Sequence, residues 1–364
     1  MHELQKKILK GWRYIKSYLT ISKKIGFYGA FGYGNIGDDA SYFALKDFMK
    51  MDIRPLSKKL YAFNPLVLKA MLVGGGGIFH WNAPYFPRRI LMKDKWDFPI
   101  IILSAGINCD YLCKYTSEAI KKIRRLCNIS TLITVRDSLT RDFLLNLGVK
   151  KKIRILPDLA LILREKKVNL PFKKDSFTVG ISLAAHTEFT KRKNKELVFL
   201  ITKIVNYLIS KGHQILFLPF QICEYDKIDE RKIFWQLIQN VEDKEKLYIL
   251  DRYYSPPEML YIIKNYCDFI LGMRLHSNIF AANSGTPFIS LSYNIKHKAF
   301  LKMMDLSMLD IPITSPSLLK EFRAKFEEII KNYDSIKSKI TVQKEFLQEV
   351  VKKEIQYIFN NFLT

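Results

Sequence analysis

Arg274 and His276 are the residues of this sequence whose types and spacing best suit chemistry. A guanidinium can bind a carboxylate or phosphate through two parallel hydrogen bonds, and an imidazole can transfer a proton near neutral pH. The pair follows an apolar stretch, residues 268–272, and precedes small and apolar residues typical of a helix. An arginine and a histidine at a helix start can also serve only as structural partners. The strand–turn–helix context favours an anion site beside a proton-transfer group, because ligands of α/β proteins bind at the carboxyl ends of strands.

Two glycine-rich segments in the first half of the chain follow short predicted strands. Residues 32–37 fit the G-x-G-x-x-G pattern, but the acidic residue that should end the next strand is missing, because Asp52 precedes Ile53. A nicotinamide enzyme is therefore excluded. The run Gly74–Gly77 is not followed by Gly-Lys-Ser/Thr, so it is not a Walker loop. The first segment predicts a close approach of backbone to a ligand, and the second predicts a close approach of a ligand or of another backbone. Asp38 or Asp39 is expected to cap the helix predicted at 40–49.

Short apolar strands alternate with helices along the whole chain, which predicts an α/β protein with parallel, doubly wound sheets. A length of 364 residues suits two such domains. Strands are expected at 25–30, 70–73, 99–104, 131–135 and 153–156, then at 177–183, 214–218, 247–250, 268–272 and 287–291. The predicted organisation is a basic amphipathic helix at 1–24, an N-terminal domain at 25–165, a linker at 166–176, a C-terminal domain at 177–310 and C-terminal helices at 311–364.

The charge balance is strongly basic. Lys and Arg number 59 against 35 Asp and Glu, which gives a formal net charge of +24. This charge suits nucleic acid, anionic lipid or anionic substrates as partners, and a lysine-rich coding bias explains it equally well. The helix predicted at 1–24 is typical both of a segment at an anionic membrane surface and of one packed on the protein body, and packing is slightly favoured. The sequence has no recognisable secretory signal, and its five cysteines form no CxxC pair, so a cytoplasmic location is expected. The basic helix at 1–24 would allow peripheral contact with the inner face of the cell membrane.

Several short motifs occur in a fixed order through both predicted domains. They are Gly34-Asn35-Ile36-Gly37-Asp38, Gly74–Gly77, Val135-Arg136-Asp137-Ser138 with Leu147-Gly148, Pro157-Asp158, Gly272–Ser277, and Gly285-Thr286-Pro287 with Ser292-Tyr293 and Lys296. In this order and spacing the chain resembles the polysaccharide pyruvyl transferase family from about residue 25 to about residue 305. One departure is Leu218–Gln221, which lacks a histidine that some members carry after the proline.

The resemblance implies two Rossmann-like domains facing a cleft, as in the GT-B glycosyltransferases. It also implies transfer of an enolpyruvyl unit from phosphoenolpyruvate to a sugar of a cell-surface polysaccharide or its lipid-linked precursor, which gives a pyruvate ketal and phosphate. Arg274 would then bind the donor and His276 would act in acid–base catalysis, with no cofactor or metal. The expected substrate-binding residues are Gly34, Asn35, Gly37, Asp38, Gly75, Gly76, Arg136, Asp158, Ser277 and Lys298.

Two other functions stay open at this point. A nucleotide-sugar glycosyltransferase could share the architecture, because fold alone does not fix function. A basic, non-catalytic protein of a membrane surface or of nucleic acid would agree with the charge, although no nucleic-acid-binding motif accompanies it and no specific nucleic acid is expected.

Overall fold

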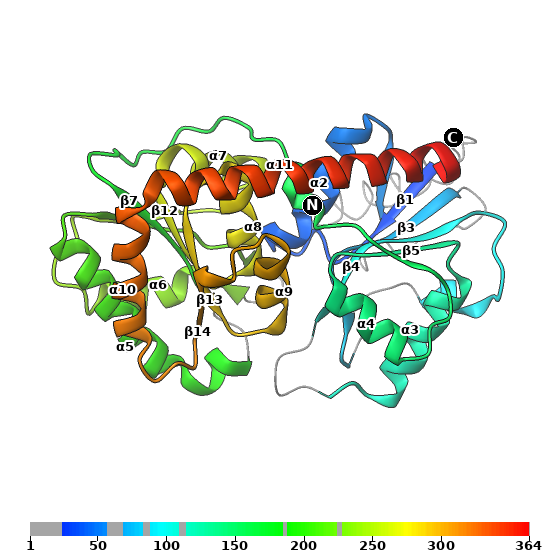
Figure 1. Ribbon diagram of the computed structural model, residues 1–364, viewed down its shortest axis with the longest axis horizontal. Helices are drawn as coiled ribbons and strands as arrows, with labels where there is room; N and C mark the ends of the chain where they lie inside the picture. The colour runs from blue at the N-terminus through cyan, green and yellow to red at the C-terminus, as the bar shows by residue number, and fades with distance from the viewer. Residues whose placement is uncertain are drawn as a thin grey trace, which may run out of the picture.

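The computed structural model describes residues 24–56, 68–82, 88–108, 114–184, 188–223 and 228–363. Two six-stranded parallel sheets stand next to each other, each with helices packed around it (Figure 1). We call them the N-terminal and C-terminal domains. The predicted fold class, α/β with two Rossmann-like domains, is confirmed. The predicted boundaries between the domains stay predictions.

The N-terminal sheet reverses its strand order between β1 and β3. Its order is β2 (Ile53–Leu56), β1 (Lys24–Tyr28), β3 (Leu68–His80), β4 (Ile100–Asn108), β5 (Leu132–Val135) and β6 (Ile153–Ile155), and its helices are α2 (Ile36–Met49), α3 (Ser117–Ile129) and α4 (Ser138–Asn146). Where the order reverses, the loops after the two strands diverge and leave room for a ligand. The two glycine-rich segments predicted from the sequence belong to these two strands.

Three details of the N-terminal domain differ from the sequence-based prediction. Strand β3 continues through the glycine run instead of ending before it, and a Cβ at Gly74 would lie 1.9 Å from the carbonyl oxygen of Leu103 on β4. Strand β2 was not among the expected strands; it contains Pro55, whose missing N–H is tolerated because β2 is an edge strand. Helix α2 begins at Ile36 and is capped by Asn35, so the prediction that Asp38 or Asp39 caps it is wrong.

The C-terminal sheet has its own reversal, between β7 and β12. The order is β11 (Leu247–Ile249), β8 (Gln214–Phe217), β7 (Thr178–Ser182), β12 (Phe269–Gly272), β13 (Phe288–Ser292) and β14 (Asp310–Pro312). The helices are α5 (Glu188–Ser210), α6 (Arg231–Ile238), α7 (Pro256–Tyr266), α8 (Leu275–Ser284), α9 (Ile295–Met303) and α10 (Leu318–Lys331), and a small hairpin pairs β9 (Ile222–Cys223) with β10 (Ile228–Asp229). The turn that carries Arg274 and His276 follows β12, at this reversal.

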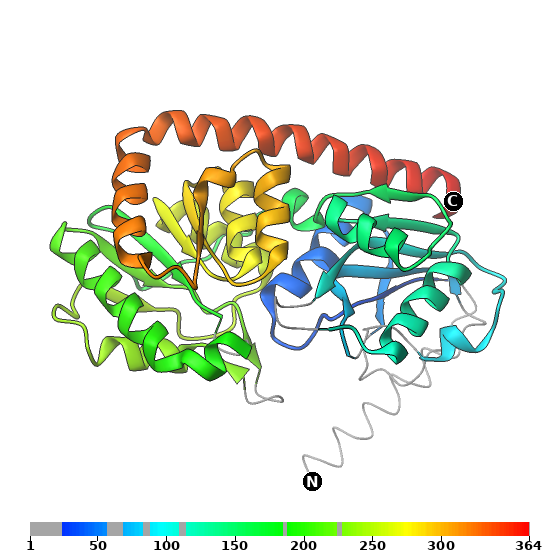
Figure 2. The same cartoon turned by 60° about the horizontal axis from the view of Figure 1, so that its bottom comes forward.

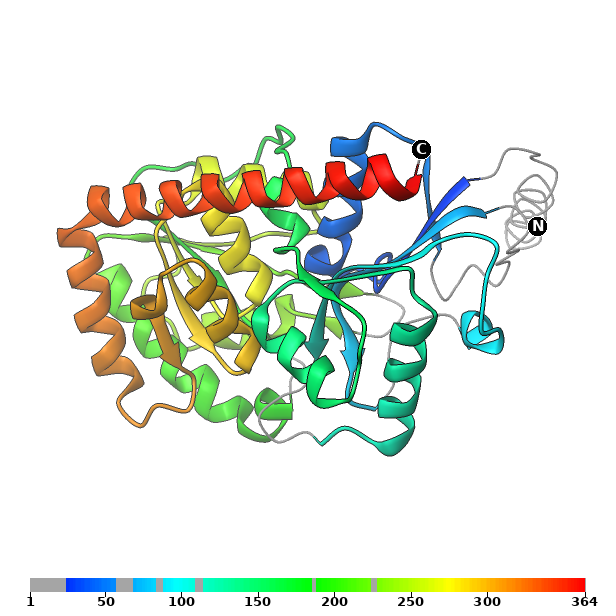
Figure 3. The same ribbon diagram turned by 45° about the vertical axis from the view of Figure 1, so that its right-hand side comes forward.

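The two domains meet through both apolar and backbone contacts. One continuous buried cluster includes side chains of β1 and α2 as well as of β7, β12 and α8. Helix α2 packs against α7, α8 and the 3-10 turn η3 (Leu159–Ile162), an arrangement visible in Figure 3. The backbone also pairs across the junction, since Ile36 N donates to Phe220 O at 2.9 Å and Ile222 N donates to Gly34 O at 2.9 Å.

The last long helix, α11 (Tyr333–Ile358), runs from the C-terminal domain across the face of the N-terminal one (Figures 1 and 2). Glu354 pairs with Arg154 of β6, and Gln348 Nε2 donates to Leu161 O at 2.6 Å. The C-terminal helices expected at 311–364 are α10 and α11, and α11 is continuous from Tyr333 to Ile358. The N-terminal helix predicted at 1–24 falls outside the described residues, apart from Lys24, which opens β1. No helix within the described ranges is long and apolar enough to cross a membrane.

Candidate active site

The Arg274–His276 turn is short and tightly held. Strand β12 ends at Gly272, Arg274 stands at the N-cap position of α8, and the helix begins at Leu275. Ser277 Oγ donates to Arg274 O at 2.6 Å, which fixes the first turn of α8 and accounts for the buried position of the predicted substrate-binding residue Ser277. The strand end thus places two polar side chains beside a helix N-terminus, where the helix dipole favours anions.

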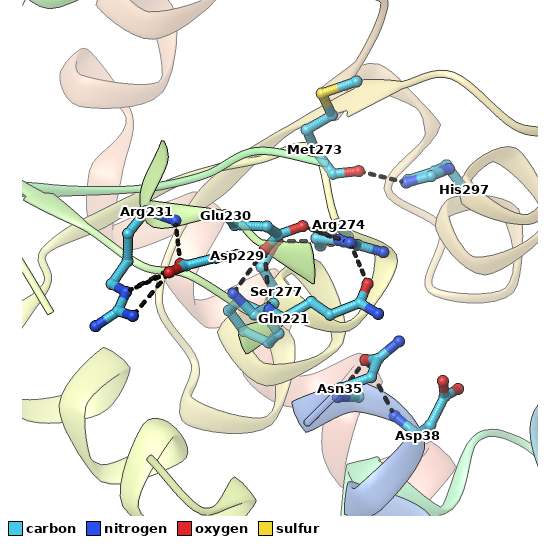
Figure 4. A network of polar contacts seen from close by, with 12 residues as sticks. Asn35, Asp38, Gln221, Asp229, Glu230, Arg231, Met273, Arg274, Ser277 and His297 are labelled. Atoms are coloured by element: carbon cyan, nitrogen blue, oxygen red, sulfur yellow. Dashed lines mark hydrogen bonds and ion pairs between the residues drawn. The ribbon is translucent and has the colours of Figure 1, made fainter. Parts of the chain in front are cut away.

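Arg274 is anchored by two residues that the sequence did not single out. Its Nε donates to Glu230 Oε1 at 2.6 Å and its Nη2 to Gln221 Oε1 at 2.7 Å, and Nη2 also pairs with the Glu230 carboxylate (Figure 4). Burial lowers the pKa of Arg274, but the fully buried Glu230, together with Tyr293 and Asp38, outweighs this and raises the pKa above its ordinary value. Among the described residues, only Nη1 of this guanidinium lacks an acceptor, so Arg274 presents one nitrogen rather than two to a ligand.

His276 faces a buried carboxylate of the other domain. Its Nε2 lies 3.6 Å from Asp158 Oδ2, and neither atom has a hydrogen-bond partner among the described residues. Asp158 Oδ1 caps η3 by accepting from Ala160 N at 3.0 Å. Burial raises the pKa of Asp158, but His276, Arg136 and the Ala160 amide together hold it below its ordinary value. Asp158 is therefore a carboxylate that both caps a turn and faces the candidate acid–base histidine.

Arg136 lies inside the domain junction rather than on the surface. Its side chain is only 5% exposed, and its Nη1 is 3.9 Å from Asp158 Oδ2 while its Nε is 3.3 Å from Asp137 Oδ2. The guanidinium covers Gly106 of β4, where a Cβ would lie 2.3 Å from Nε. Arg136 thus lies at the carboxyl ends of β4 and β5, where its Nη2 also donates to Ile107 O at 3.4 Å.

The loop from Gly34 to Asp38 reaches across the junction to His276. Asn35 Oδ1 accepts from Gly37 N at 3.1 Å and so starts α2 close to the C-terminal domain. Gly37 packs on the imidazole so closely that a Cβ would lie 2.0 Å from His276 Nδ1. Glycine is required here for this close approach, and the loop and the Arg274–His276 turn form one site.

Asp38 follows at the third position of α2 and is half-buried. A Cβ at Gly76 of β3 would lie 2.7 Å from its Oδ1, and Gly76 has a φ of 77°, a conformation that glycine adopts readily. Burial raises the pKa of Asp38, although His276, Lys296, Arg274 and Arg136 act in the opposite direction. The Asp38 carboxylate therefore lies close enough to each cation of the site for their charges to lower its pKa.

The remaining predicted residues divide between this cluster and its surroundings. Gly75 packs against Ser41 of α2, where a Cβ would lie 2.6 Å from the serine Cβ, so Gly75 allows α2 to approach β3. Lys298 is exposed on α9, and its charge lowers the pKa of Asp310. The charge of Lys296, two residues earlier, instead lowers the pKa of Asp38. Residues two apart on a helix point to different sides, so the structure brings Lys296 rather than Lys298 to the cluster.

The site combines cations with an acid–base pair. Arg274, Arg136 and Lys296 supply positive charge, and His276 with Asp158 supplies a group that can move a proton. Such a set can bind a small molecule that carries more than one negative charge and can protonate it. No cluster of three or more metal-ligating side chains was found within the described ranges.

Solved structures with the same architecture are enzymes of UDP-sugars. The Staphylococcus aureus MnaA–UDP complex aligns with a TM-score of 0.60 at 11% identity over 94% of this chain and 98% of that one. The UDP-GlcNAc 2-epimerase of Neisseria meningitidis bound to UDP-GlcNAc gives a TM-score of 0.54 at 11% identity over 91% and 99% of the two chains. At these identities the likeness shows the GT-B-like fold and no more.

Sequence comparison identifies the family. The amylovoran biosynthesis protein AmsJ of Erwinia amylovora is 24% identical over 225 residues, which are 57% of this chain and 53% of that protein, so the match spans about half of the length of this relative. The sequence model of the family described as polysaccharide pyruvyl transferase matches residues 12–295 of the 364. Because that match covers most of the chain and contains both Arg274 and His276, this protein belongs to the polysaccharide pyruvyl transferase family.

Proposed function

We propose that this protein transfers the pyruvyl group of phosphoenolpyruvate to a sugar of a cell-surface polysaccharide or of its lipid-linked precursor, forming a pyruvate ketal and releasing phosphate. Support comes from the family, from the relative that is named for amylovoran biosynthesis, and from the composition of the site. The observation that carries the proposal is the convergence of His276, Asp158 and three cations from both domains.

The charges of the site suit this donor. Phosphoenolpyruvate carries a carboxylate and a phosphate, and Arg274 and Arg136 enter the site from opposite domains. Arg274 is held by Glu230 and Gln221, so its free Nη1 is aimed before any ligand arrives, which reduces the cost of ordering it. Positive charge around the phosphate also stabilises it as it leaves.

His276 suits the proton transfer that this donor needs. Protonation of C3 makes C2 electrophilic enough for a hydroxyl to attack, so a positioned general acid is required. The carboxylate of Asp158, 3.6 Å from Nε2, can stabilise the imidazolium form that delivers the proton. The imidazole is packed on Gly37, which limits its rotation.

Phosphate release from phosphoenolpyruvate across a panel of glycan acceptors tests the proposal. We expect turnover with at least one acceptor in the wild type and its loss, by about 10²-fold or more, in His276→Ala. His213→Ala is the matched control, because His213 packs on Phe177 and Phe326 in the C-terminal domain, away from the site, and should leave turnover unchanged. Turnover of His276→Ala close to that of the wild type contradicts the assigned role.

A ligand-binding measurement separates the proposal from a nucleotide-sugar enzyme of the same fold. Phosphoenolpyruvate is expected to raise the midpoint of thermal unfolding, and UDP-GlcNAc is not. Stabilisation by UDP-GlcNAc alone would favour the glycosyltransferase alternative.

A further inference from the structure

We propose that Asp38 is the second acid–base residue of this site: it accepts the proton of the first acceptor hydroxyl and later passes that proton to the departing phosphate. The inference rests on the proposed donor and adds the group that works opposite His276.

Ketal formation moves two protons. Two hydroxyl oxygens of the acceptor become bonded to C2 of the donor, so two hydroxyl protons must leave. C3 gains one proton when the vinyl group becomes a methyl group, and the phosphate takes the other as it departs. A group that donates to C3 cannot at the same moment accept from the hydroxyl, so a concerted addition needs a second group beside His276.

Asp38 is placed across from His276 and belongs to the other domain. It follows Gly37, whose Cα lies against the His276 imidazole, and its Oδ1 lies over Gly76. Figure 4 shows its side chain pointing from the start of α2 toward the region that holds Arg274 and Gln221. The carboxyl group thus lies between the two glycine-rich segments and the cations that would hold the donor.

Asp38 differs from the other acidic residues around the site in having no hydrogen bond to hold it. Asp137 accepts from Thr140 N, Asp158 from Ala160 N, and Glu230 from Phe220 N and Gln221 N. Asp39, the next residue, accepts from Gly32 N and Tyr253 Oη. Within the described ranges no residue donates a hydrogen bond to the Asp38 carboxylate, which leaves its oxygens available to a substrate hydroxyl.

Burial also prepares Asp38 to exchange protons. Desolvation raises its pKa above the ordinary value even though four cationic groups oppose the shift. A carboxylate with a raised pKa is a stronger base than an exposed one, and its protonated form persists closer to neutral pH.

The proton cycle closes with these two residues. In the first step the imidazolium of His276 protonates C3, a hydroxyl oxygen forms a bond to C2, and its proton moves to Asp38. In the second step the other hydroxyl oxygen bonds to C2 and gives its proton to neutral His276, while the bond between C2 and the phosphate oxygen breaks and Asp38 protonates that oxygen. Both residues then have their initial protonation states, and the products are the ketal and phosphate.

The test compares Asp38→Asn with Asp47→Asn, a control on the same helix whose exposed carboxylate pairs with Arg164. We expect Asp38→Asn to lower kcat by about 10²-fold to 10⁴-fold while phosphoenolpyruvate still raises the thermal midpoint as in the wild type. Asp47→Asn should keep both properties. Loss of phosphoenolpyruvate binding together with turnover, or a kcat within about threefold of the wild type, would overturn the inference.

The pH profile supplies a readout that a structural role would not move. In the wild type, kcat/KM should decline at low pH as Asp38 becomes protonated, at a pH above the ordinary range of an aspartate. Asp38→Asn should lack this decline, and Asp38→Glu, which keeps the carboxylate, should restore it together with at least about a tenth of the rate. A Glu variant no more active than the Asn variant contradicts the proposal. Absence of turnover in the wild type with every acceptor would instead count against the donor chemistry itself.

Discussion

At the scale of single residues, the site depends on partners that hold Arg274 in place. Glu230 has no exposed surface, and its two carboxylate oxygens have different tasks: Oε1 accepts from Arg274, and Oε2 accepts from the amides of Phe220 and Gln221. Gln221 in turn accepts from Arg274 through its side chain. One buried carboxylate therefore connects the anion-binding arginine to the segment that pairs with the N-terminal domain.

Removing Glu230 should be costly for stability. In Glu230→Ala the guanidinium of Arg274 would remain largely buried without its counter-charge, and we expect a loss of about 3 kcal/mol in the free energy of unfolding, measured by urea denaturation. Glu349→Ala is the control, because Glu349 forms an exposed pair with Lys352 on α11, and it should cause no measurable loss. Equal losses in the two variants would mean that the buried pair does not contribute as described.

At the scale of elements, the site is formed where each sheet reverses its strand order. The Gly34–Asp38 loop ends in the first turn of α2 at the reversal of the N-terminal sheet, and the Arg274–His276 turn follows β12 at the reversal of the C-terminal one. Each reversal leaves a gap between diverging loops, and here the loops of the two domains meet. His297 of α9 supports the turn from behind, with its Nε2 3.0 Å from Met273 O.

The contact between Gly37 and His276 gives a direct test at this scale. The methyl group of Gly37→Ala would overlap the imidazole, so His276 must move by about 1 Å or more, and kcat should decrease about 10²-fold. Gly180→Ala is the control, because its Cβ would meet only Ile270 and other core atoms behind β7. That variant should be less stable, but its folded fraction should keep the wild-type kcat. An active Gly37→Ala protein would show that His276 need not stay where it lies.

At the scale of the whole molecule, three connections fix the domains relative to each other. The backbone pairing near Asn35 and Gln221 joins the loops, and α11 spans both domains with Glu354 paired to Arg154. Tyr253, before α7, donates to Asp39 of α2 at 2.5 Å. Burial and the neighbouring Asp39 both raise the pKa of Tyr253, so its hydroxyl stays protonated and remains a donor.

Tyr253→Phe should weaken the junction without disturbing either sheet. Loss of a hydrogen bond to a buried carboxylate should reduce the free energy of unfolding by about 2 kcal/mol, and kcat should decrease because the Gly34–Asp38 loop is less well held. Tyr333→Phe removes a hydroxyl that donates to Asp268 O within the C-terminal domain. It should lower stability by about 1 kcal/mol and leave kcat unchanged. If both variants keep the wild-type kcat, the Tyr253–Asp39 contact does not position the loop.

Much of this arrangement could be predicted from the sequence, because local patterns carry it. Apolar strands alternating with helices indicated two doubly wound sheets, and the residues around Arg274 and His276 indicated a turn between a strand and a helix. The glycine run marked a close approach of another backbone, which Gly74 makes to Leu103, whereas Gly37 and Gly76 face the side chains of His276 and Asp38. The prediction was less accurate where local signals conflict with tertiary pairing: β3 continues through four glycines because β4 pairs alongside it, and Pro55 lies in an edge strand.

By itself, the sequence determined the types of group available and the elements that carry them, since strand and helix periodicity depend on neighbouring residues. Only the tertiary structure decided which groups meet. Glu230 and Asp158 are far from Arg274 and His276 along the chain, and no local pattern marks them as partners. Likewise, the choice between Lys296 and Lys298 depends on which side of α9 faces the junction. Distances between residues of different domains follow from how the two sheets pack, and that packing is a property of the whole chain.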